Sequence, residues 1–415
     1  MRSLRIGLLL GLRQIQRASF WTTSLIIFVM MLTFLNLIAV SGILVGLIAG
    51  AEVALRESAV GDIIIEPLDD EDRILETPAL LSKFSSFPEI TAYSVRYNGA
   101  GTLEANYKER RDLTGERDTA ALTVTGIDPV LEDKMTNLSD LVVKGEYLDP
   151  NEEGKILIGI YYLEEYAELY GDLFDTVENV NPGDIVRVSV GEVSKEFEVK
   201  GIVESKVDEV NFTTFIPERE FRRLFNRIDR NADQIVVRVV DPAENATVKD
   251  SLIDAGVGEL AEIKTYEENV PKFLADIKNT FDLLGAFIGS IGLIVASITI
   301  FIIIFINALS RRQQIGILKG IGIDRVSIEV AYVLQAAFYA LVGSALGALI
   351  TYGFLIGYLM ENPIDFPFSD GIMVADPIST LYRFVTLFII TLFAGFIPAW
   401  MIVRQNTLNS ILGRK

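Results

Sequence analysis

The stretch ASFWTTSLIIFVMMLTFLNLIAVSGILVGLIAGA, residues 18–51, decides the fold class, because no Asp, Glu, Lys or Arg interrupts it. Three further uncharged, apolar runs follow at residues 283–310, 330–360 and 384–403. About 20 apolar residues are enough for a helix to cross about 30 Å of hydrocarbon. The sequence therefore predicts an integral membrane protein with four transmembrane helices, and it excludes a wholly cytoplasmic enzyme.

The charged residues predict how the chain is oriented. Residues 1–50 carry four arginines and no acidic residue, whereas residues 51–280 hold 49 acidic and 25 basic residues. Basic residues beside membrane spans mark the cytoplasmic side. We therefore expect a multi-pass protein of the cell (cytoplasmic or inner) membrane with both termini in the cytoplasm. The first run is longer than the core of a signal peptide, so we expect it to remain as an uncleaved anchor.

The composition removes several classes of chemistry. The chain has no cysteine and no histidine, which excludes disulfides, thiolate nucleophiles, imidazole bases and Cys/His zinc sites. The sequence contains no GxxxxGK[ST] motif and hence no P-loop. No charge lies within the four apolar runs, which disfavours ion-coupled secondary transport. We expect no catalytic residue, no metal site and no nucleic-acid partner.

The segments around the apolar runs predict the remaining organisation. The N-terminal segment has a basic, one-sided apolar pattern typical of an interfacial helix, although a plain basic flank would also fit. Helical sequence without proline extends past the first span, and an amphipathic run leads into the second, which predicts a stalk of two long helices. The predicted parts are a cytoplasmic interfacial helix (1–17), transmembrane helix 1 with stalk (18–57), an extracytoplasmic α+β domain (58–263), stalk with transmembrane helix 2 (264–310), a cytoplasmic loop with a short helix (311–328), transmembrane helix 3 (329–360), a short external loop (361–382), transmembrane helix 4 (383–404) and a cytoplasmic tail (405–415).

The α+β assignment rests on short β-branched runs separated by turn signals. Examples are DIIIE at Asp62–Glu66 and IVVRVV at Ile235–Val240, with Asn-Pro-Gly-Asp at residues 181–184 as a turn. Helical patterns lie between these runs, so the domain is expected to contain two subdomains.

Small residues recur at helical spacing in the first span. Gly42, Gly46 and Gly50 give two consecutive GxxxG steps. Such steps let helices approach closely. We expect these three glycines to form a helix-packing face, either within the chain or across a dimer.

The loop between the second and third spans carries the most specific motif. It reads LSRRQQIGILKGIGIDRVSI at residues 309–328. Two arginines follow a span, a short amphipathic helix comes next, and a Gly-Ile-Gly turn leads into the following span. Ile315, Leu318 and Ile321 fall on one side of that predicted helix, and we expect something to cover this apolar stripe.

This stretch resembles the signature of the FtsX-like permease family, which reads roughly RRxEIGxLRAxG and belongs to membrane subunits of MacB-type and lipoprotein-releasing ABC systems. The resemblance implies a coupling helix that docks on a cytoplasmic ATPase. The family usually has Glu at the position of Gln314, whose amide cannot form the salt bridge that a carboxylate would. The implied ATPase-coupling residues are Arg311, Arg312, Gln314, Ile315, Gly316, Leu318, Lys319 and Gly322.

The segment between the first two spans is similar to the MacB periplasmic core. The matching motifs, in chain order, are Gly61–Ile65, Val124–Pro129, Lys144–Leu148 and Asn181–Asp184. The resemblance implies an α-helical membrane protein with four transmembrane helices plus a large α+β extracytoplasmic domain on a helical stalk. It implies the permease subunit of a mechanotransmission-type ABC transporter, which couples ATP hydrolysis by a separate ATPase to motion of the external domain. The substrate would be exported or extracted, and a lipoprotein, lipid, peptide or drug would fit.

The same resemblance implies the partners. The chain itself would hold no cofactor, because ATP and Mg would be bound by a cytoplasmic ABC ATPase dimer. A second permease copy or paralogue, the lipid membrane and an extracytoplasmic adaptor complete the expected set. An alternative function is a signalling relay that activates an external partner such as a cell-wall hydrolase. An external enzyme would need paired carboxylates or a Ser/Lys arrangement, and the sequence offers no motif for either.

The predicted topology can be tested by labelling single cysteines in intact cells. Cysteines placed at Ser86 and Ser205 should react with a membrane-impermeant thiol reagent, because both positions are expected outside. A cysteine at Ser410 should not react until the cells are opened. Labelling at position 410 in intact cells would contradict the orientation.

Overall fold

The structure, a computed structural model, describes residues 2–108, 117–169, 174–270, 272–362, 364–366, 368–371 and 373–404. The described residues fall into two compact units. A membrane unit contains residues 1–49, 273–366 and 370–415, and an α+β unit contains residues 50–272 together with 367–369. The tail predicted at 405–415, together with the labelling position Ser410, lies outside the described residues.

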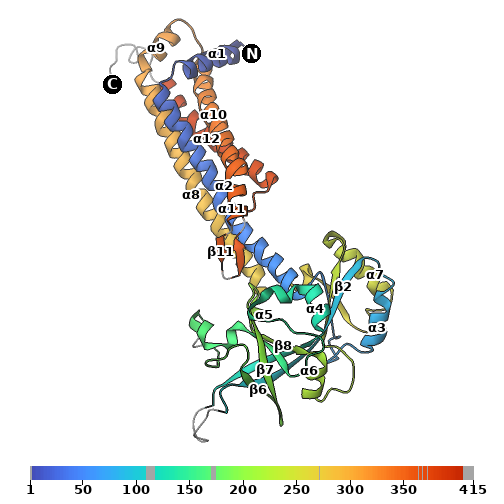
Figure 1. The fold of residues 1–415 in the computed structure, drawn as a ribbon. Helices are drawn as coiled ribbons and strands as arrows, with labels where there is room; N and C mark the ends of the chain where they lie inside the picture. The colour runs from blue at the N-terminus through green and yellow to red at the C-terminus, as the bar shows by residue number, and fades with distance from the viewer. Residues whose placement is uncertain are drawn as a thin grey trace. The chain divides into compact units, whose positions relative to one another are not determined.

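The membrane unit is helical apart from one small hairpin (Figure 1). Four of its helical segments are long and apolar enough to cross a membrane: Phe20–Val60, Leu274–Ser310, Arg325–Glu361 and Pro377–Val403. The predicted four-helix membrane fold is therefore confirmed. The elements are α1 (Arg2–Gln16), α2 (Phe20–Leu55), α8 (Lys272–Ser310), α9 (Arg312–Gly320), α10 (Arg325–Ile350), the π-helical turn η7 (Thr351–Leu355), α11 (Ile356–Glu361), β11 (Ile364–Phe366), β12 (Ser369–Gly371) and α12 (Pro377–Val403).

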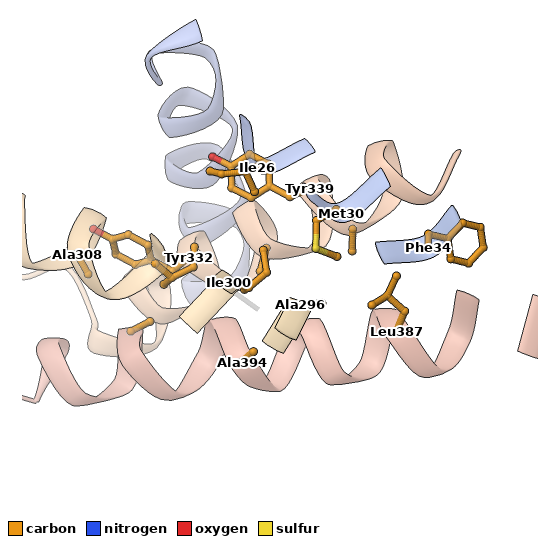
Figure 2. Packing of buried hydrophobic residues seen from close by; sticks show 14 of the residues in the cluster. Ile26, Met30, Phe34, Ala296, Ile300, Ala308, Tyr332, Tyr339, Leu387 and Ala394 are labelled. Atoms are coloured by element: carbon orange, nitrogen blue, oxygen red, sulfur yellow. The ribbon is translucent and has the colours of Figure 1, made fainter. Parts of the chain in front are cut away.

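The core of the membrane unit combines aromatic side chains with small ones (Figure 2). Phe34 of α2 and Tyr332 of α10 are almost fully buried, as is Leu387 of α12. Ala296 of α8 and Ala394 of α12 belong to the same cluster. Membrane helices gain little from the hydrophobic effect, so close packing over small residues is what holds such a bundle together.

Helices α10 and α2 approach each other closely. A Cβ atom on Gly343 would lie 2.5 Å from Met30 Cβ, and one on Gly347 would lie 3.1 Å from the Met31 carbonyl oxygen. The predicted packing glycines of α2 are placed differently. Gly42 and Gly46 are buried and Gly50 is half-buried. Gly42 faces the segment before α12, where its carbonyl accepts a 3.0 Å hydrogen bond from the Val374 amide.

The α+β unit is built on one sheet, in the strand order β10-β1-β9-β2-β3-β8-β5-β7-β4, with β6 pairing β2 and β7. This confirms the predicted α+β class. The strands are β1 (Ile63–Glu66), β2 (Ile90–Glu104), β3 (Thr119–Ile127), β4 (Val142–Gly145), β5 (Lys155–Gly159), β6 (Ile185–Val190), β7 (Val193–Val203), β8 (Thr213–Pro217), β9 (Gln234–Val239) and β10 (Glu262–Thr265). The helices are α3 (Thr77–Phe84), α4 (Pro129–Thr136), α5 (Asp208–Asn211), α6 (Glu218–Leu224) and α7 (Asn245–Asp254).

Two hydrophobic cores share this sheet through the long strand β2. Its first half pairs with β9, and its second half pairs with β3. One core lies among β1, β9, β10, α3 and α7. Together with β2, these elements follow one another as β1-α3-β2-β9-α7-β10, which is the βαββαβ order of a ferredoxin-like fold. The other core lies among the strands inserted between β2 and β9. Ser205 is buried at 8% exposure there, so exposed Ser86 is the better labelling position.

The α10–α2 contact makes a prediction about stability. Replacing Gly343 with Leu should push the two helices apart and cost about 1–3 kcal/mol, the usual range for overpacking. A lower thermal unfolding midpoint of the detergent-purified protein would report this loss. The matched control is Gly357→Leu, because a Cβ there would have no neighbour within 4 Å. Equal midpoints for the two variants would contradict the packing described.

Candidate functional site

The loop after α8 forms a short helix with defined ends. The chain leaves helical geometry at Arg311, and α9 then runs from Arg312 to Gly320. Gly322 has φ +93°, a left-handed conformation that only glycine adopts without strain. The amide of Ile323 donates to the Leu318 carbonyl and that of Gly322 to the Lys319 carbonyl, at 3.0 and 3.1 Å. These two bonds form a Schellman C-cap, which explains the glycine in the motif.

Helix α9 has an inner and an outer face. Ile315 is only 4% exposed, and it belongs to the buried core of the membrane unit. Leu318 is partly buried and packs against the same core. On the opposite side Gln313 and Gln314 are exposed, and the side chains of Ile317 and Ile321 are 54% and 71% exposed.

This arrangement corrects the expected apolar stripe. Ile315 and Leu318 are covered by the chain's own helices, so they need no partner to remove them from water. Ile321 does not share their side and points outward instead. The reason is that α9 has fewer than three turns, too few for the sequence pattern alone to tell an inner face from an outer one. The surface that a partner could cover consists of Gln313, Gln314, Ile317 and Ile321, which we call the outer face of α9.

Basic residues of the loop fasten α9 to its own unit. The Lys319 ammonium donates a 3.0 Å hydrogen bond to the carbonyl of Val403, the last residue of α12, where a cation suits the negative end of the helix. Burial lowers the pKa of Lys319, and the neighbouring charge of Arg325 lowers it further. Arg311 and Arg312 are half-buried at the start of the helix. Helix α9 is thus held to the membrane helices by a side-chain hydrogen bond as well as by packing.

Helix α1 lies at the same end of the bundle as α9 (Figure 1). A Cβ on Gly7 would lie 2.8 Å from the Ser327 carbonyl oxygen, and one on Gly11 would lie 3.0 Å from that of Ala331, so α1 packs against α10. The Ser327 hydroxyl also donates to the carbonyl of Ser3 at 2.9 Å. Leu8 and Leu12 are at least half exposed, as an interfacial helix requires.

In the α+β unit, the C-terminal end of α2 is fixed to the sheet. The helix widens into a π-helical turn at Arg56–Val60, and Gly61 reverses the chain with φ +68°. Asp62, 4% exposed, accepts a 3.0 Å hydrogen bond from the Val239 amide and lies 3.7 Å from the Arg56 guanidinium. The Arg238 guanidinium reaches back and donates to the Glu57 carbonyl at 3.3 Å. We call residues 56–62 the helix–sheet joint.

The two strands next to the long helices pair with each other. β1 follows α2, β10 precedes α8, and Ile63 of β1 lies opposite Thr265 of β10 in an antiparallel ladder. The Tyr266 amide then donates to the Asp62 carbonyl at 2.9 Å. The chain therefore enters and leaves the sheet at neighbouring points.

One buried ion pair beside the joint was not foreseen from the sequence. Arg96 of β2 holds Glu132 of α4 by two hydrogen bonds of 2.5 and 3.2 Å, and it donates to Gln234 of β9 at 3.2 Å. All three line a cavity of about 250 Å³. Single charges in a strand pattern give no signal of such a pairing, because their partners are 36 and 138 residues away.

Comparison with protein families finds two matches that together cover most of the chain. Residues 23–255 match the MacB-like periplasmic core domain. Residues 286–407 match the FtsX-like permease C-terminal family. The second match contains α9 and its Schellman turn.

Individual relatives agree with these matches. A macrolide export ATP-binding/permease protein MacB of Campylobacter jejuni is 25% identical over 57% of this chain and 38% of its own length. An uncharacterized ABC transporter permease of Methanocaldococcus jannaschii is 22% identical over 66% of this chain and 65% of its own length. The chain thus spans well under half the length of the MacB relative.

Among solved structures, the periplasmic region of MacB from Actinobacillus actinomycetemcomitans aligns with 51% of this chain and 92% of its own, at a TM-score of 0.35 and 14% identity. The match to the MacB-like periplasmic core covers more than half of the sequence, and the FtsX-like match covers the three spans that follow. The chain therefore has a MacB-like periplasmic core domain followed by an FtsX-like permease C-terminal region, and it is a MacB-like ABC transporter permease.

Proposed function

We propose that the chain is a mechanotransmission subunit of an ABC transporter. A separate cytoplasmic ABC ATPase dimer binds the ATP and Mg and docks on the outer face of α9. Closure of this ATPase dimer moves the membrane helices and the α+β unit. Both termini would be cytoplasmic in this arrangement. The observation that carries the proposal is the two-sided character of α9. Its inner face is part of the membrane core and its outer face presents two large isoleucines on a loop of basic residues.

The route of the motion runs along α2 and α8. Each helix is continuous over more than 35 residues, or more than about 50 Å, which exceeds the thickness of the hydrocarbon. Within the α+β unit, the helix–sheet joint fixes the end of α2 by Asp62 and Arg238. Because β1 and β10 are paired, a displacement of either helix end would act on the same sheet edge.

The proposed output is work on a substrate at the outer side of the membrane. The apolar runs of the four spans contain no charge that could bind and release an ion, which supports a mechanism without a closed channel across the membrane. A second permease copy or paralogue would complete the complex, and an adaptor on the far side is a further candidate partner.

The docking prediction concerns Ile317 and Ile321. Changing both to Asp should reduce the amount of ATPase that co-purifies with the chain by at least about tenfold, since burying an apolar side chain contributes roughly 1.5–3 kcal/mol. Insertion and the melting midpoint should be unaffected, because both side chains are exposed. Ile315→Asp should instead destabilise the permease itself, because it places a charge in the core.

The control for docking is Ile228→Asp with Val240→Asp, two exposed positions in the α+β unit with the same change of charge. This pair should retain the ATPase fully. If the α9 double variant also retained it at the wild-type level, the docking site would lie elsewhere, and α1 would be the next segment to test.

The transmission prediction concerns Asp62. Asp62→Ala removes the link to Val239 and the contact with Arg56, and should cost about 1–3 kcal/mol. The ATPase should still bind and hydrolyse ATP. Spin labels at position 86 of two copies should, however, lose their ATP-dependent change in distance. Asp250→Ala, an exposed carboxylate of α7, serves as the matched control. An unchanged distance response in Asp62→Ala would show that the joint does not transmit the motion.

A further inference from the structure

A groove of about 600 Å³ opens on the membrane unit between α2, α8 and α12. Leu37 and Leu293 form apolar parts of its wall, and Gly285 and Gly289 leave the adjoining surface of α8 without side chains. A Cβ on Gly285 would lie 3.5 Å from Leu44, an ordinary contact distance, so the glycine is not required for packing. Gly285 thus leaves room on this side of α8, whereas a Cβ on Gly289 would lie 3.3 Å from Leu37 Cδ2, tighter than an ordinary contact.

Two side chains of opposite charge line this groove. Arg383 of α12 is half-buried and donates a hydrogen bond to the Ser41 hydroxyl of α2. Asp282 of α8 is exposed in the same groove. Within the part of the chain that the structure describes, neither forms an ion pair within 4.0 Å, with the other or with any further residue. Arg383 thus keeps its charge at the edge of a membrane span with a neutral hydroxyl as its hydrogen-bond partner, which makes it a candidate binding residue.

The groove lies at the depth of the lipid headgroups. Arg383 precedes Val403, the end of α12, by a helical distance of about 30 Å, which matches the hydrocarbon thickness. The uncharged run 384–403 fills this distance. Arg383 thus lies at the boundary of the hydrocarbon layer, on the side where the chain connects α10 to α12. Leu293 and Thr386 lie further into the apolar layer. Asp282 and Ser379 lie towards water.

We propose that the groove binds one aminophospholipid of this leaflet, with its phosphate at Arg383, its primary ammonium at Asp282 and the start of an acyl chain against Leu37 and Leu293. An Arg guanidinium is well suited to phosphate oxygens, and the carboxylate supplies the opposite charge for the amine. A lipid with a net negative headgroup would satisfy Arg383 but would meet repulsion from Asp282.

The pair of opposite charges is what favours a zwitterionic headgroup as the occupant over an apolar helix face of a second copy. The proposal concerns lipid binding by this chain and does not depend on the ATPase.

The test uses the full-length chain, delipidated in detergent and offered equal amounts of phosphatidylethanolamine and phosphatidylglycerol. Retained lipid is counted by native mass spectrometry. The wild type should retain one phosphatidylethanolamine per chain with about tenfold preference. Arg383→Gln, which removes the charge, should lose this retention by about tenfold, and Arg383→Lys should restore most of it. Asp282→Asn should keep a bound lipid but lose the preference for the amine.

Two further variants separate the groove from the general membrane surface. Gly285→Leu should abolish retention by filling the groove while both charges remain. Lys278→Gln removes a charge from α8 outside the groove and should behave as wild type. Equal retention of the two lipids by the wild type, or unchanged retention in Arg383→Gln, would overturn the proposal. It would also be overturned if Asp282→Asn and Arg383→Gln lowered the dimer fraction and left lipid retention unchanged, because the groove would then be a subunit contact.

Discussion

The pairing of β1 with β10 is the contact on which the rest of the architecture depends. It joins the strand that follows α2 to the strand that precedes α8, with Ile63 opposite Thr265. The first and last strands of the α+β unit are therefore neighbours in its sheet, so the chain enters and leaves the unit at adjacent points. The hydrogen bond from Tyr266 to Asp62 closes the same junction. Without this pairing, the strand that follows α2 and the strand that precedes α8 would not share a ladder.

A second feature of the architecture is that the short helix α9 belongs both to the buried core and to the surface. Ile315 anchors α9 among the membrane helices, and Lys319 ties it to the end of α12. The isoleucines at positions 317 and 321 remain exposed.

The sequence predicted what depends on local pattern and length. Uncharged runs long enough to cross a bilayer have few structural alternatives, so the four spans and the α+β insertion were predicted correctly, and Gly322 stands where a left-handed residue is needed. What could not be predicted depends on contacts between distant residues. The inward direction of Ile315 is set by helices elsewhere in the chain, and Gly42 lies against the segment before α12 rather than against another helix. The convergence of Asp282 and Arg383 on one groove likewise has no local signal.

The order of strands has a consequence for how the protein is made. Among the strands that the structure describes, β1 pairs with β9 and β10, which are synthesised after the other strands of the sheet. The three consecutive isoleucines of β1 therefore have no partner strand until β9 and β10 have been synthesised. Such non-local pairing is slow, and an unpaired apolar strand invites association with other chains. The protein is therefore most exposed to aggregation during its biogenesis, because β1 is synthesised first and is paired last.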